Sequence, residues 1–497
     1  MSLPPEQRET GALLSRLTGA AAPLETHISA IYVGADHTLK LKKAVALSFL
    51  DFTALAARER FCRRELEINA PAAPGIYRTV HAVTRGADGA LRLDGDGEVV
   101  DWVLEMATLP ADGFLNLIAA RHGVDGALAD ALGDTVAALH ATQPVVEGLD
   151  SEAAMQRVLA GAVESCRLAK LPMPEVERLS AGLGAAFAAR RGLLNARAAA
   201  GHVRRCHGDL HLGNLVLWQK RPVAFDALEF DEVLATVDTG YDLAFLLMDL
   251  DQRADRAAAN RTLSRYLGRT GDTGLLGGLA PWLSLRAMVR SYCEVLAGKD
   301  GMPYLRAAQR YLEPAPPVLL AVGGLPGTGK SWLARALAPG IGAAPGALVL
   351  RSDEIRKRLA GVEPETRLPP GAYTPARKAE TYAAFLREAR EALSGGHSVV
   401  ADATFLDPAQ RAGIEAVARE AGCPFLGLWL EAPMTVLRDR IAARRHDASD
   451  ADLAVLEASA RLDPGPLAWE AVRADADPVA AATALLARLR PAPERQP

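Results

Sequence analysis

The stretch Gly324-Leu-Pro-Gly-Thr-Gly-Lys330-Ser331 lies between an apolar run, Val318–Val322, and a helix-forming run, Trp332–Ala338. Its spacing is that of a phosphate-binding loop, G-x-x-x-x-G-K-S, between a strand and a helix. Glycines let backbone N–H groups turn inward around an anion, the helix N-terminus adds positive charge, the lysine reaches the β- and γ-phosphates, and the serine hydroxyl can ligate Mg²⁺. The predicted nucleotide contacts are Gly324, Gly327, Thr328, Gly329, Lys330 and Ser331, with Ser331 also a metal ligand.

Strand-like and helix-like runs alternate after this loop. Further strands are predicted at Ala347–Arg351, Ser398–Ala401 and Phe425–Leu430. Strands that alternate with helices in this way form a parallel sheet covered by helices on both faces. The chain from the phosphate-loop strand onward is therefore expected to be an α/β domain.

The segment Glu313-Pro-Ala-Pro-Pro317 precedes the phosphate-loop strand. Its prolines cannot continue the preceding helix, because proline lacks a backbone donor and clashes with the turn before it. A chain of 497 residues is also too long for one ordinary core. We therefore predict a first module at 1–312, a linker at 313–317 and a second module at 318–497.

The first module has two parts that differ in pattern. Strand-like runs come first, around a helical run at Phe52–Asn69. These runs lie at 27–45, Tyr77–Thr84, Leu91–Leu93 and Val99–Met106. From Ala111 to Arg197 the pattern is mostly helical. A small strand-rich lobe followed by a large helical lobe predicts a two-lobed α+β fold.

A short stretch of the first module carries the residues of a second chemistry. The run His207-Gly-Asp209-Leu-His-Leu-Gly-Asn214 is followed by a strand-like segment and Asp226. Phosphoryl transfer needs a carboxylate that accepts or orients the attacking hydroxyl, and an amide and a second carboxylate that hold Mg²⁺. We predict Asp209 as the catalytic base, and Asn214 and Asp226 as metal ligands.

These motifs resemble the aminoglycoside phosphotransferase family, relatives of protein kinases that phosphorylate hydroxyls of small molecules. Ala138-Leu-His140 is similar to that family's helical L-x-x-L-H signature, and Asp238…Asp242-Leu-Ala to its D-x-x-x-D-L-A pattern. The resemblance covers roughly residues 25–300 and implies a two-lobed protein-kinase-like fold. We expect His140 and His207 to be structural, with His207 orienting the catalytic loop.

The resemblance also implies a nucleotide-anchoring lysine on the strand Leu39–Val45. Lys40 and Lys42 point the same way in a strand, and we prefer Lys40 over Lys42. The helix partner of the lysine is expected to be Glu65, with Glu59 as the second choice.

Two further nucleotide contacts follow from the same resemblance. Val103-Leu-Glu105-Met106 resembles the hinge, in which backbone groups of Glu105 and Met106 meet the adenine. Val33-Gly34-Ala-Asp36 is the nearest candidate for a glycine-rich loop. The acidic run Glu229–Glu232, together with Asp249, Asp251 and Asp255, could attract a cationic substrate; a solvated helix face is the alternative.

In the second module one strand ends in Ser352-Asp353 before a helix with Arg356, and the next ends in Asp402. With the phosphate loop, these residues resemble the small P-loop kinases around polynucleotide kinase, zeta-type toxins and gluconate-type sugar kinases. Parallel strands end at one edge of the sheet, so both aspartates should face the γ-phosphate. Asp353 is expected to accept the hydroxyl proton, Arg356 to position substrate and Asp402 to support Mg²⁺; the alternative is that these aspartates cap helices.

A late helix of the second module is rich in arginine. Arg440 and Arg444 are four residues apart, so they are expected to share one helix face. The resemblance implies that they neutralise the transferring phosphate, with Arg438 a less certain third member. A solvated helix face is again the alternative.

Charge and hydropathy argue against nucleic acid and membrane as partners of the protein. The formal net charge is −4, so no global basic field exists to hold nucleic acid. The N-terminal residues lack the apolar core of a signal peptide, and no apolar run reaches the roughly 18 residues of a membrane span. The five scattered cysteines suit a reducing cytoplasm.

The combined hypothesis is a cytoplasmic bifunctional kinase of small molecules that uses ATP or GTP and Mg²⁺. It resembles a bacterial family of phosphotransferase/ATP-binding fusions, and its acceptor would be a sugar, an aminoglycoside or a related metabolite. Two alternatives stay open: one module is a regulatory nucleotide switch for the other, or the second module is a nucleic-acid 5′-hydroxyl kinase.

Overall fold

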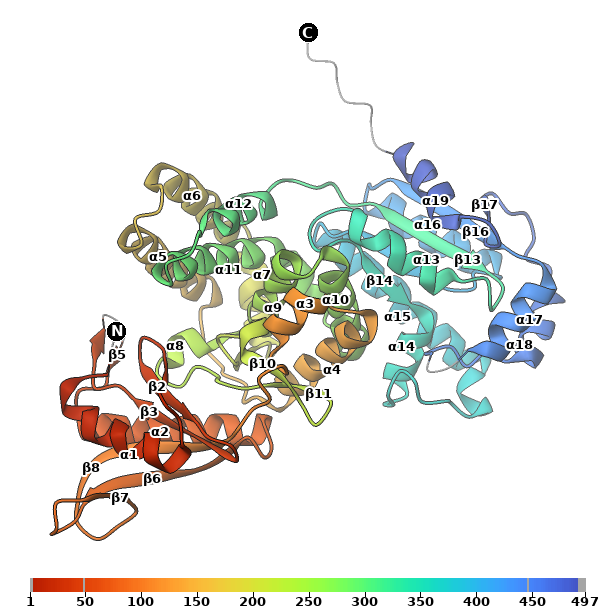
Figure 1. The fold of residues 1–497 in the computed structure, drawn as a ribbon. Coiled ribbons are helices and arrows are strands. Elements are labelled where there is room, and N and C mark those ends of the chain that lie inside the picture. Colours follow the sequence, from red (N-terminus) through yellow and green to blue (C-terminus); the bar gives the residue numbers. More distant parts are fainter. Residues whose placement is uncertain (1–2, 48–49, 445–446, 490–497) are drawn as a thin grey trace. The chain divides into compact units, whose positions relative to one another are not determined.

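The computed structural model describes residues 3–47, 50–444 and 447–489 (Figure 1). The chain forms two compact units. Unit 1 consists of Met1–Gly123, Leu139–Gly148 and Gly201–Asp242; unit 2 consists of Val124–Ala138, Leu149–Ala200 and Leu243–Pro497. Unit 2 contains residues on both sides of 313–317, so the predicted linker does not separate the compact units. The module bounds 1–312 and 318–497 stay a prediction.

Unit 1 is built on a six-stranded antiparallel sheet with the order β1-β2-β3-β8-β6-β7. Leu39 and Leu41 of β3 belong to the apolar cluster that includes Leu14 of α1 (Arg8–Thr18). Because side chains alternate along a strand, Lys40 and Lys42 face the opposite side, towards α2 (Leu55–Ala72). The strands are β1 (Leu24–Glu25), β2 (Ser29–Val33), β3 (His37–Lys42), β6 (Tyr77–Arg85), β7 (Leu91–Leu93) and β8 (Glu98–Ala107).

Three pairs of short antiparallel strands complete unit 1: β4 with β5, β9 with β12, and β10 with β11. The pair β10–β11 places Asn214 just before one strand and Asp226 just after the other. The predicted α+β fold of the first module is confirmed. The bounds are β4 (Ala46–Leu47), β5 (Leu50–Asp51), α3 (Leu115–His122), β9 (Val203–Arg205), β10 (Leu215–Trp218), β11 (Arg221–Ala224), α8 (Glu232–Ala235) and β12 (Thr236–Asp238).

Unit 2 contains a five-stranded sheet in which every pair is parallel, with the order β14-β15-β13-β16-β17. Helices α13 and α19 cover one face, and α15 and α16 the other (Figure 1). This is the predicted α/β P-loop fold; β17 was not predicted. The strands are β13 (Leu319–Gly324), β14 (Leu348–Arg351), β15 (Val399–Asp402), β16 (Phe425–Glu431) and β17 (Glu470–Arg473).

The helices of the P-loop part are α13 (Lys330–Leu337), α14 (Ser352–Leu359), α15 (Pro375–Ser394), α16 (Pro408–Glu420), α17 (Met434–Ala443), α18 (Leu453–Ala460) and α19 (Pro478–Ala487). The other helices with residues in unit 2 are α4 (Gly126–Thr142), α5 (Ser151–Leu168), α6 (Met173–Ala189), α7 (Arg191–Ala199), α9 (Thr239–Arg253), α10 (Arg256–Thr270), α11 (Leu276–Leu296) and α12 (Met302–Tyr311). Among the described residues, no helix is both long enough and apolar enough to cross a membrane.

Strand β14 lies at the edge of the parallel sheet, and helix α10 packs along it. The Asn260 side chain donates to the Ala347 carbonyl at 2.8 Å, and the Val349 amide donates to the Ser264 hydroxyl at 3.2 Å. An edge strand exposes backbone groups that would otherwise pair with another strand. Two side chains of α10 thus satisfy backbone groups at the edge of the sheet.

Candidate active sites

The predicted catalytic loop of unit 1 brings its polar residues together. The Asn214 amide nitrogen donates to the Asp209 carboxylate at 2.9 Å and to the Asp209 carbonyl at 3.0 Å. Asp242 accepts the backbone amides of His207 at 3.2 Å and Gly208 at 2.9 Å, and lies 3.2 Å from Nε2 of His140. Asp242 therefore fixes the backbone that precedes Asp209.

His207 is buried and orients this loop, as predicted. Its Nε2 lies 2.9 Å from the Phe225 carbonyl, and its Nδ1 accepts the Asp209 amide at 3.3 Å. A carbonyl only accepts, so the proton lies on Nε2. Burial lowers the pKa of His207, and the nearby carboxylates of Asp242 and Asp209 oppose this effect. The neutral ring thus links β11 to the catalytic loop.

Both predicted lysines bind the predicted helix partner. Lys40 and Lys42 lie 2.7 Å from the two carboxylate oxygens of Glu65, which is fully buried. Lys40 also reaches Asp226 at 2.5 Å, whereas Lys42 pairs with Glu229. The second choice, Glu59, instead pairs with an arginine on the exposed face of α2. The contact with Asp226 favours Lys40 as the lysine of the site.

The charges of this cluster hold one another in the ionised form. Burial by itself would lower the pKa of Lys40, but Asp226 and Glu65 outweigh it and raise that pKa well above its usual value. The same balance raises the pKa of Lys42 through Glu65 and Glu229. Burial opposes ionisation of Glu65, yet the two lysines lower its pKa. In the kinase-like site, two lysines thus share the three carboxylates of Glu65, Asp226 and Glu229.

Glu229 is a partner of this site that was not predicted from the sequence. Glu229 is 6% exposed, and burial raises its pKa while Lys42 opposes that effect. Asn69 and Tyr77 were also missed: they accept the backbone amides of Ala227 and Asp226, each at 2.8 Å. Glu229 comes three residues after Asp226, but no local spacing rule connects it to Lys42.

Asp249, Asp251 and Asp255, from the predicted acidic set, also contact other groups of the protein. Asp249 lies 2.7 Å from Arg253, the Tyr311 hydroxyl donates to Asp251 at 2.5 Å, and Asp255 caps α10. These contacts serve the fold and give no support to a cationic-substrate surface.

The predicted hinge residues lie inside the sheet. Glu105 and Met106 belong to β8, which pairs with β3 on one edge and β6 on the other. The Ala107 amide donates to the Ile76 carbonyl at 2.7 Å, and the Glu105 side chain contacts Arg78 and His81. A nucleotide role for Glu105 and Met106 stays a prediction.

Gly34, in the candidate glycine-rich loop, has a packing reason to be glycine. It lies in the turn between β2 and β3, where a Cβ would be 2.8 Å from the His37 carbonyl and 2.9 Å from the Thr18 carbonyl. The side chain of Thr108 donates to the Gly34 carbonyl at 2.8 Å. This contact joins the turn to the segment after β8.

The phosphate loop of unit 2 has the backbone that its glycines predict. Gly327 and Gly329 adopt φ values of 86° and 92°, which only glycine adopts readily. At Gly324, with φ 137°, a Cβ would lie 2.6 Å from the Leu430 carbonyl. The Lys330 ammonium donates to the Leu325 carbonyl at 2.9 Å, and the Thr328 hydroxyl donates to the same carbonyl at 2.8 Å.

Asp402 ends β15 next to the phosphate loop, as predicted. In the sheet it pairs with Val322 on one side and Arg351 on the other. The Ser331 hydroxyl donates to its carboxylate. Neither Asp402 nor Asp353 caps a helix through its side chain, because the caps of the following helices are Asp407 and Arg351. The capping alternative is therefore wrong for both.

Arg351 is a site residue that was not predicted from the sequence. It is 5% exposed and contacts Asp402 at 3.4 Å, Glu354 at 2.7 Å and Asp447 at 3.1 Å. An arginine at the end of an otherwise apolar buried strand was the available signal. Arg351 and Ser331 contact the same carboxylate oxygen of Asp402, so both side chains help to fix its position.

Asp353 and Arg356 form a pair on α14, 2.6 Å apart. The Arg356 guanidinium lies 5.1 Å from the centre of the Tyr373 ring. Both Asp402 and Asp353 act on the pKa of Lys330, so the predicted base lies within electrostatic reach of the phosphate loop.

The predicted arginines in and after α17 differ in their contacts. Arg440 donates to the Thr328 carbonyl of the phosphate loop at 3.3 Å and to the Ala474 carbonyl at 2.8 Å. Arg438 pairs with Glu457 at 3.5 Å, and both side chains are about half exposed. The prediction that Arg440 and Arg444 share a helix face is wrong, because α17 ends at Ala443 and Arg444 is its extended C-cap.

Burial has the largest effect on the charge of Lys330 in the phosphate loop. Burial lowers the pKa of Lys330; Asp402 and Asp353 oppose this effect, and Arg444 and Arg351 add to it. A bound anion would therefore favour the charged form of Lys330. Beside the loop, Leu325, Thr328 and Leu437 line part of a cavity of about 600 Å³, a volume typical of small-molecule sites.

Comparisons with known proteins agree with this division of chemistry. The model described as "Phosphotransferase enzyme family" matches residues 109–282, and the model described as "AAA domain" matches residues 319–463. Uncharacterized proteins of Mycobacterium tuberculosis and Mycobacterium bovis are 30% identical over 456 residues, which covers 88% of this chain and 89% of each relative. The chain belongs to their family. This family member is a kinase that joins a phosphotransferase domain to a P-loop kinase-like domain, and it binds nucleotide.

Solved structures resemble separate parts of the family member. The choline kinase of Cryptosporidium parvum Iowa II is 12% identical, with a TM-score of 0.39 over 58% of this chain and 86% of that chain. The gluconokinase of Sinorhizobium meliloti 1021 is 24% identical, with a TM-score of 0.25 over 36% of this chain and 95% of that chain.

Proposed function

We propose that the protein is a bifunctional kinase that transfers the γ-phosphate of ATP or GTP to hydroxyl groups of small molecules at two separate sites. The observation that carries the proposal is the convergence of both predicted residue sets, one in each compact unit. Asp209, Asn214 and Asp226 belong to unit 1, and the phosphate loop with Asp353 and Asp402 belongs to unit 2. Sugars, aminoglycosides and related metabolites are the proposed acceptors.

At the first site, Asp209 would orient the acceptor hydroxyl and accept its proton as the phosphoryl group is transferred. The Asn214 amide and the backbone amides bound by Asp242 hold the loop rigid, so the carboxylate needs little reorganisation. Lys40, kept charged by Glu65, is the proposed phosphate contact.

At the second site, the Lys330 ammonium would move from the Leu325 carbonyl to the nucleotide phosphates. Asp353 would accept the hydroxyl proton, while Arg356 positions the acceptor. Arg440 and Arg444 would offset the charge on the transferring group, which is the main catalytic demand of this reaction.

The donor sets at both sites fit Mg²⁺, which prefers carboxylate, amide and hydroxyl oxygens. Ser331 and Asp402 already lie in hydrogen-bond contact. In unit 1 the nitrogen of Asn214 is used by Asp209, which leaves the amide oxygen as the atom that can join Asp226 around a cation. A Mg²⁺ ion held by these residues would offset the negative charge of the nucleotide phosphates.

The test is nucleotide consumption by the full-length protein with pooled sugars, aminoglycosides, amino alcohols and 5′-hydroxyl oligonucleotides. Asp209→Ala should abolish turnover of one acceptor and Lys330→Ala that of another, each by at least about a hundredfold. Arg438→Ala is a matched control for Arg440→Ala: both arginines lie on α17, but only Arg440 contacts the phosphate loop.

Other outcomes would separate the alternatives. An oligonucleotide acceptor lost in Lys330→Ala would indicate a nucleic-acid 5′-hydroxyl kinase. Nucleotide binding without turnover at one site, combined with a change of activity at the other, would indicate a regulatory switch. Either result would contradict the proposal that both sites phosphorylate small molecules.

A further inference from the structure

Helix α10 belongs to the stretch matched by the phosphotransferase family, yet it contacts the P-loop part of unit 2. The Arg358 guanidinium of α14 donates to the carbonyls of Leu267 and Gly268 at 3.2 and 3.0 Å. At Gly268 a Cβ would lie 2.8 Å from a carboxylate oxygen of Glu354. A larger residue at position 268 would therefore require the Glu354 side chain of α14 to move.

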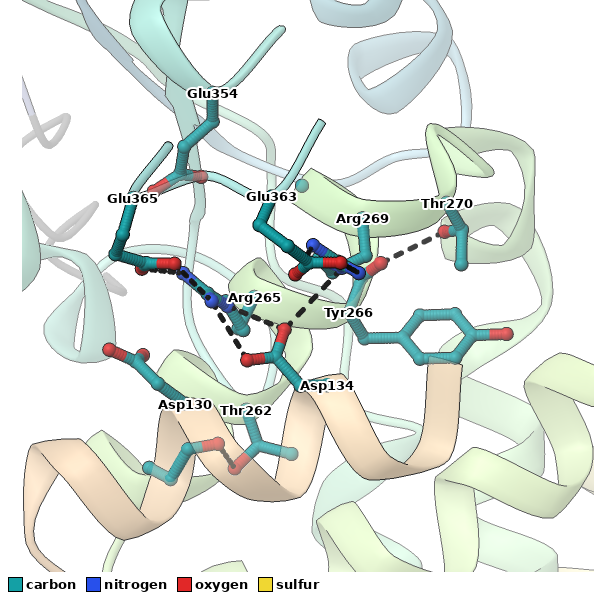
Figure 2. Close-up of polar contacts among 12 residues, drawn as sticks. Asp130, Asp134, Thr262, Arg265, Tyr266, Arg269, Thr270, Glu354, Glu363 and Glu365 are labelled. Carbon is teal, nitrogen blue, oxygen red and sulfur yellow. Dashed lines mark hydrogen bonds and ion pairs between the residues drawn. The ribbon is translucent and has the colours of Figure 1, made fainter. Parts of the chain in front are cut away.

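Arg265 of α10 uses both sides of its guanidinium (Figure 2). It binds Asp134 of α4 through two bonds of 2.7 and 2.8 Å, and Glu365 of the P-loop part through bonds of 2.7 and 3.1 Å. Arg265 is 8% exposed. Two bidentate carboxylate contacts on one buried guanidinium fix the position of both partners.

Arg269, one turn later on α10, extends the same contact. It binds Glu363 through a bond of 2.7 Å and a second, shorter one, and lies 3.5 Å from Asp134 (Figure 2). Glu363 and Glu365 begin the segment Glu363–Tyr373, which follows α14 and which we name the acceptor loop. The start of this loop is therefore held by a helix of the other family match.

The far end of the acceptor loop meets the residues assigned to the acceptor hydroxyl. Tyr373 lies against Arg356, which holds Asp353. Within the loop, the Thr366 carbonyl accepts from Lys357, which is fully buried. The position of the loop thus affects the position of Arg356 relative to Tyr373.

We propose that Arg265 and Arg269 are positioning residues for acceptor binding at the P-loop site, so that the phosphotransferase domain supplies part of the second kinase. They act through Glu363 and Glu365 on the acceptor loop and touch no reacting atom. The proposal rests on the proposed kinase function of the P-loop site, and it adds an acceptor-side element from outside the P-loop family match.

Arg261 offers a matched control. It lies one turn before Arg265 on the same helix and binds Asp130 of α4 through bonds of 2.7 and 2.6 Å. Its carboxylate partner is on α4, whereas Arg265 binds α4 and the acceptor loop. Arg261→Gln should therefore weaken the α4–α10 contact while the Arg265–Glu365 contact remains.

The first measurement is hydrogen–deuterium exchange of residues 363–373 in the full-length protein without nucleotide or acceptor. Arg265→Gln and Glu365→Gln should each increase exchange in this segment about tenfold. The double variant should add little, because both substitutions remove the same Arg265–Glu365 contact. Arg261→Gln should leave it unchanged. Asp134 and Glu365 are 34% and 38% exposed, so water can solvate them once Arg265 is replaced and the variants should fold.

The second measurement is steady-state kinetics. Its probe is the compound of the panel above whose phosphorylation Lys330→Ala abolishes. Arg265→Gln should raise the KM for this compound about tenfold, a ratio that corresponds to about 1.4 kcal/mol, with an unchanged KM for ATP. Arg265→Lys, which keeps the charge without the bidentate geometry, should recover part of the loss.

Equal exchange in wild type and Arg265→Gln would overturn the proposal, and so would equal effects of Arg261→Gln and Arg265→Gln on the acceptor KM. A wild-type protein without acceptor turnover would contradict the proposed function instead. The exchange experiment needs no activity, so the two failures are distinguishable.

Discussion

Lys40 and Lys330 are both buried lysines assigned to nucleotide phosphates, but their surroundings have opposite effects. Lys40 lies between Glu65 and Asp226, and these carboxylates raise its pKa. Lys330 donates to a carbonyl, and burial lowers its pKa; Asp402 and Asp353 oppose this effect only in part, and Arg444 and Arg351 add to it. At the first site carboxylates hold the lysine in its charged form before nucleotide binds, whereas at the second site burial disfavours the charged lysine, which phosphate would stabilise.

The buried lysines therefore contribute mainly to folding in unit 1 and mainly to nucleotide binding in unit 2. In unit 1 the lysines compensate buried carboxylates, so they stabilise the fold as well as serving the proposed reaction. In unit 2 the desolvated lysine costs stability, which the nucleotide phosphates offset when they bind. The two sites therefore should respond differently when their cations are removed.

The largest expected effect is on stability. Lys42→Met leaves the buried Glu229 without its cation, so we expect the free energy of unfolding of unit 1 to fall by about 3–5 kcal/mol. Lys330→Met removes a desolvated charge, so it should not lower the stability of unit 2. Urea denaturation of both variants, with Lys42→Arg as the control that keeps the charge, measures the difference. Equal destabilisation by Lys42→Met and Lys330→Met would contradict the expectation that only the lysine of unit 1 stabilises its fold.

A smaller effect should appear as acid sensitivity. His397 is buried and bonded to the Gly346 carbonyl at 2.8 Å, and burial lowers its pKa to about 4. The unfolded chain, with a histidine pKa of about 6.5, therefore binds the proton first as pH falls. The contribution is fully present above pH 6.5, and between pH 6.5 and 5 the free energy of unfolding should fall by about 2 kcal/mol.

Urea denaturation of unit 2 at pH 7.5 and pH 5 tests this expectation. His397→Gln keeps a donor for the Gly346 carbonyl but cannot titrate, so it should remove most of the pH dependence. In unit 1, carboxylates offset the lowered pKa of His207, and the corresponding loss should be smaller. If the free energy of unfolding of His397→Gln fell between pH 7.5 and pH 5 as much as that of the wild type, the pH dependence could not be attributed to His397.

The smallest expected effect is proton uptake on nucleotide binding. Burial lowers the pKa of Lys330, and a bound phosphate favours its charged form. Binding of a non-hydrolysable ATP analogue at the P-loop site should therefore take up a fraction of a proton at alkaline pH, and affinity should fall as pH rises towards the usual lysine pKa of about 10.4. Calorimetry in two buffers of different ionisation enthalpy measures this uptake.

Lys330→Ala provides the reference for that experiment, because it leaves the first site as the binding site under study. The raised pKa of Lys40 keeps it charged over this range, so no uptake is expected. Uptake of equal size in wild type and Lys330→Ala would assign the proton to another group.

Local patterns predicted much of both sites. The alternation along β3 placed Lys40 and Lys42 on the side that faces Glu65, and the strand order placed Asp402 beside Ser331. These predictions succeeded because a strand has a fixed side-chain period and parallel strands end at one edge.

Long-range partners could not be predicted in the same way. Lys42 and Glu229 are 187 residues apart, and Arg265 and Asp134 are 131 apart. No periodicity relates such positions. The end of α17 at Ala443 was also missed, since the helical spacing of Arg440 and Arg444 does not reveal that the backbone becomes extended at Arg444.

The bonds from Asn260 and Ser264 to β14 have a consequence for any attempt to divide this gene. A fragment that began at residue 318 would lack α10 and expose an unprotected edge on its parallel sheet. Such edges recruit strands from other molecules, so the separate fragment should self-associate. Natural selection against aggregation would then favour keeping both coding segments in one reading frame.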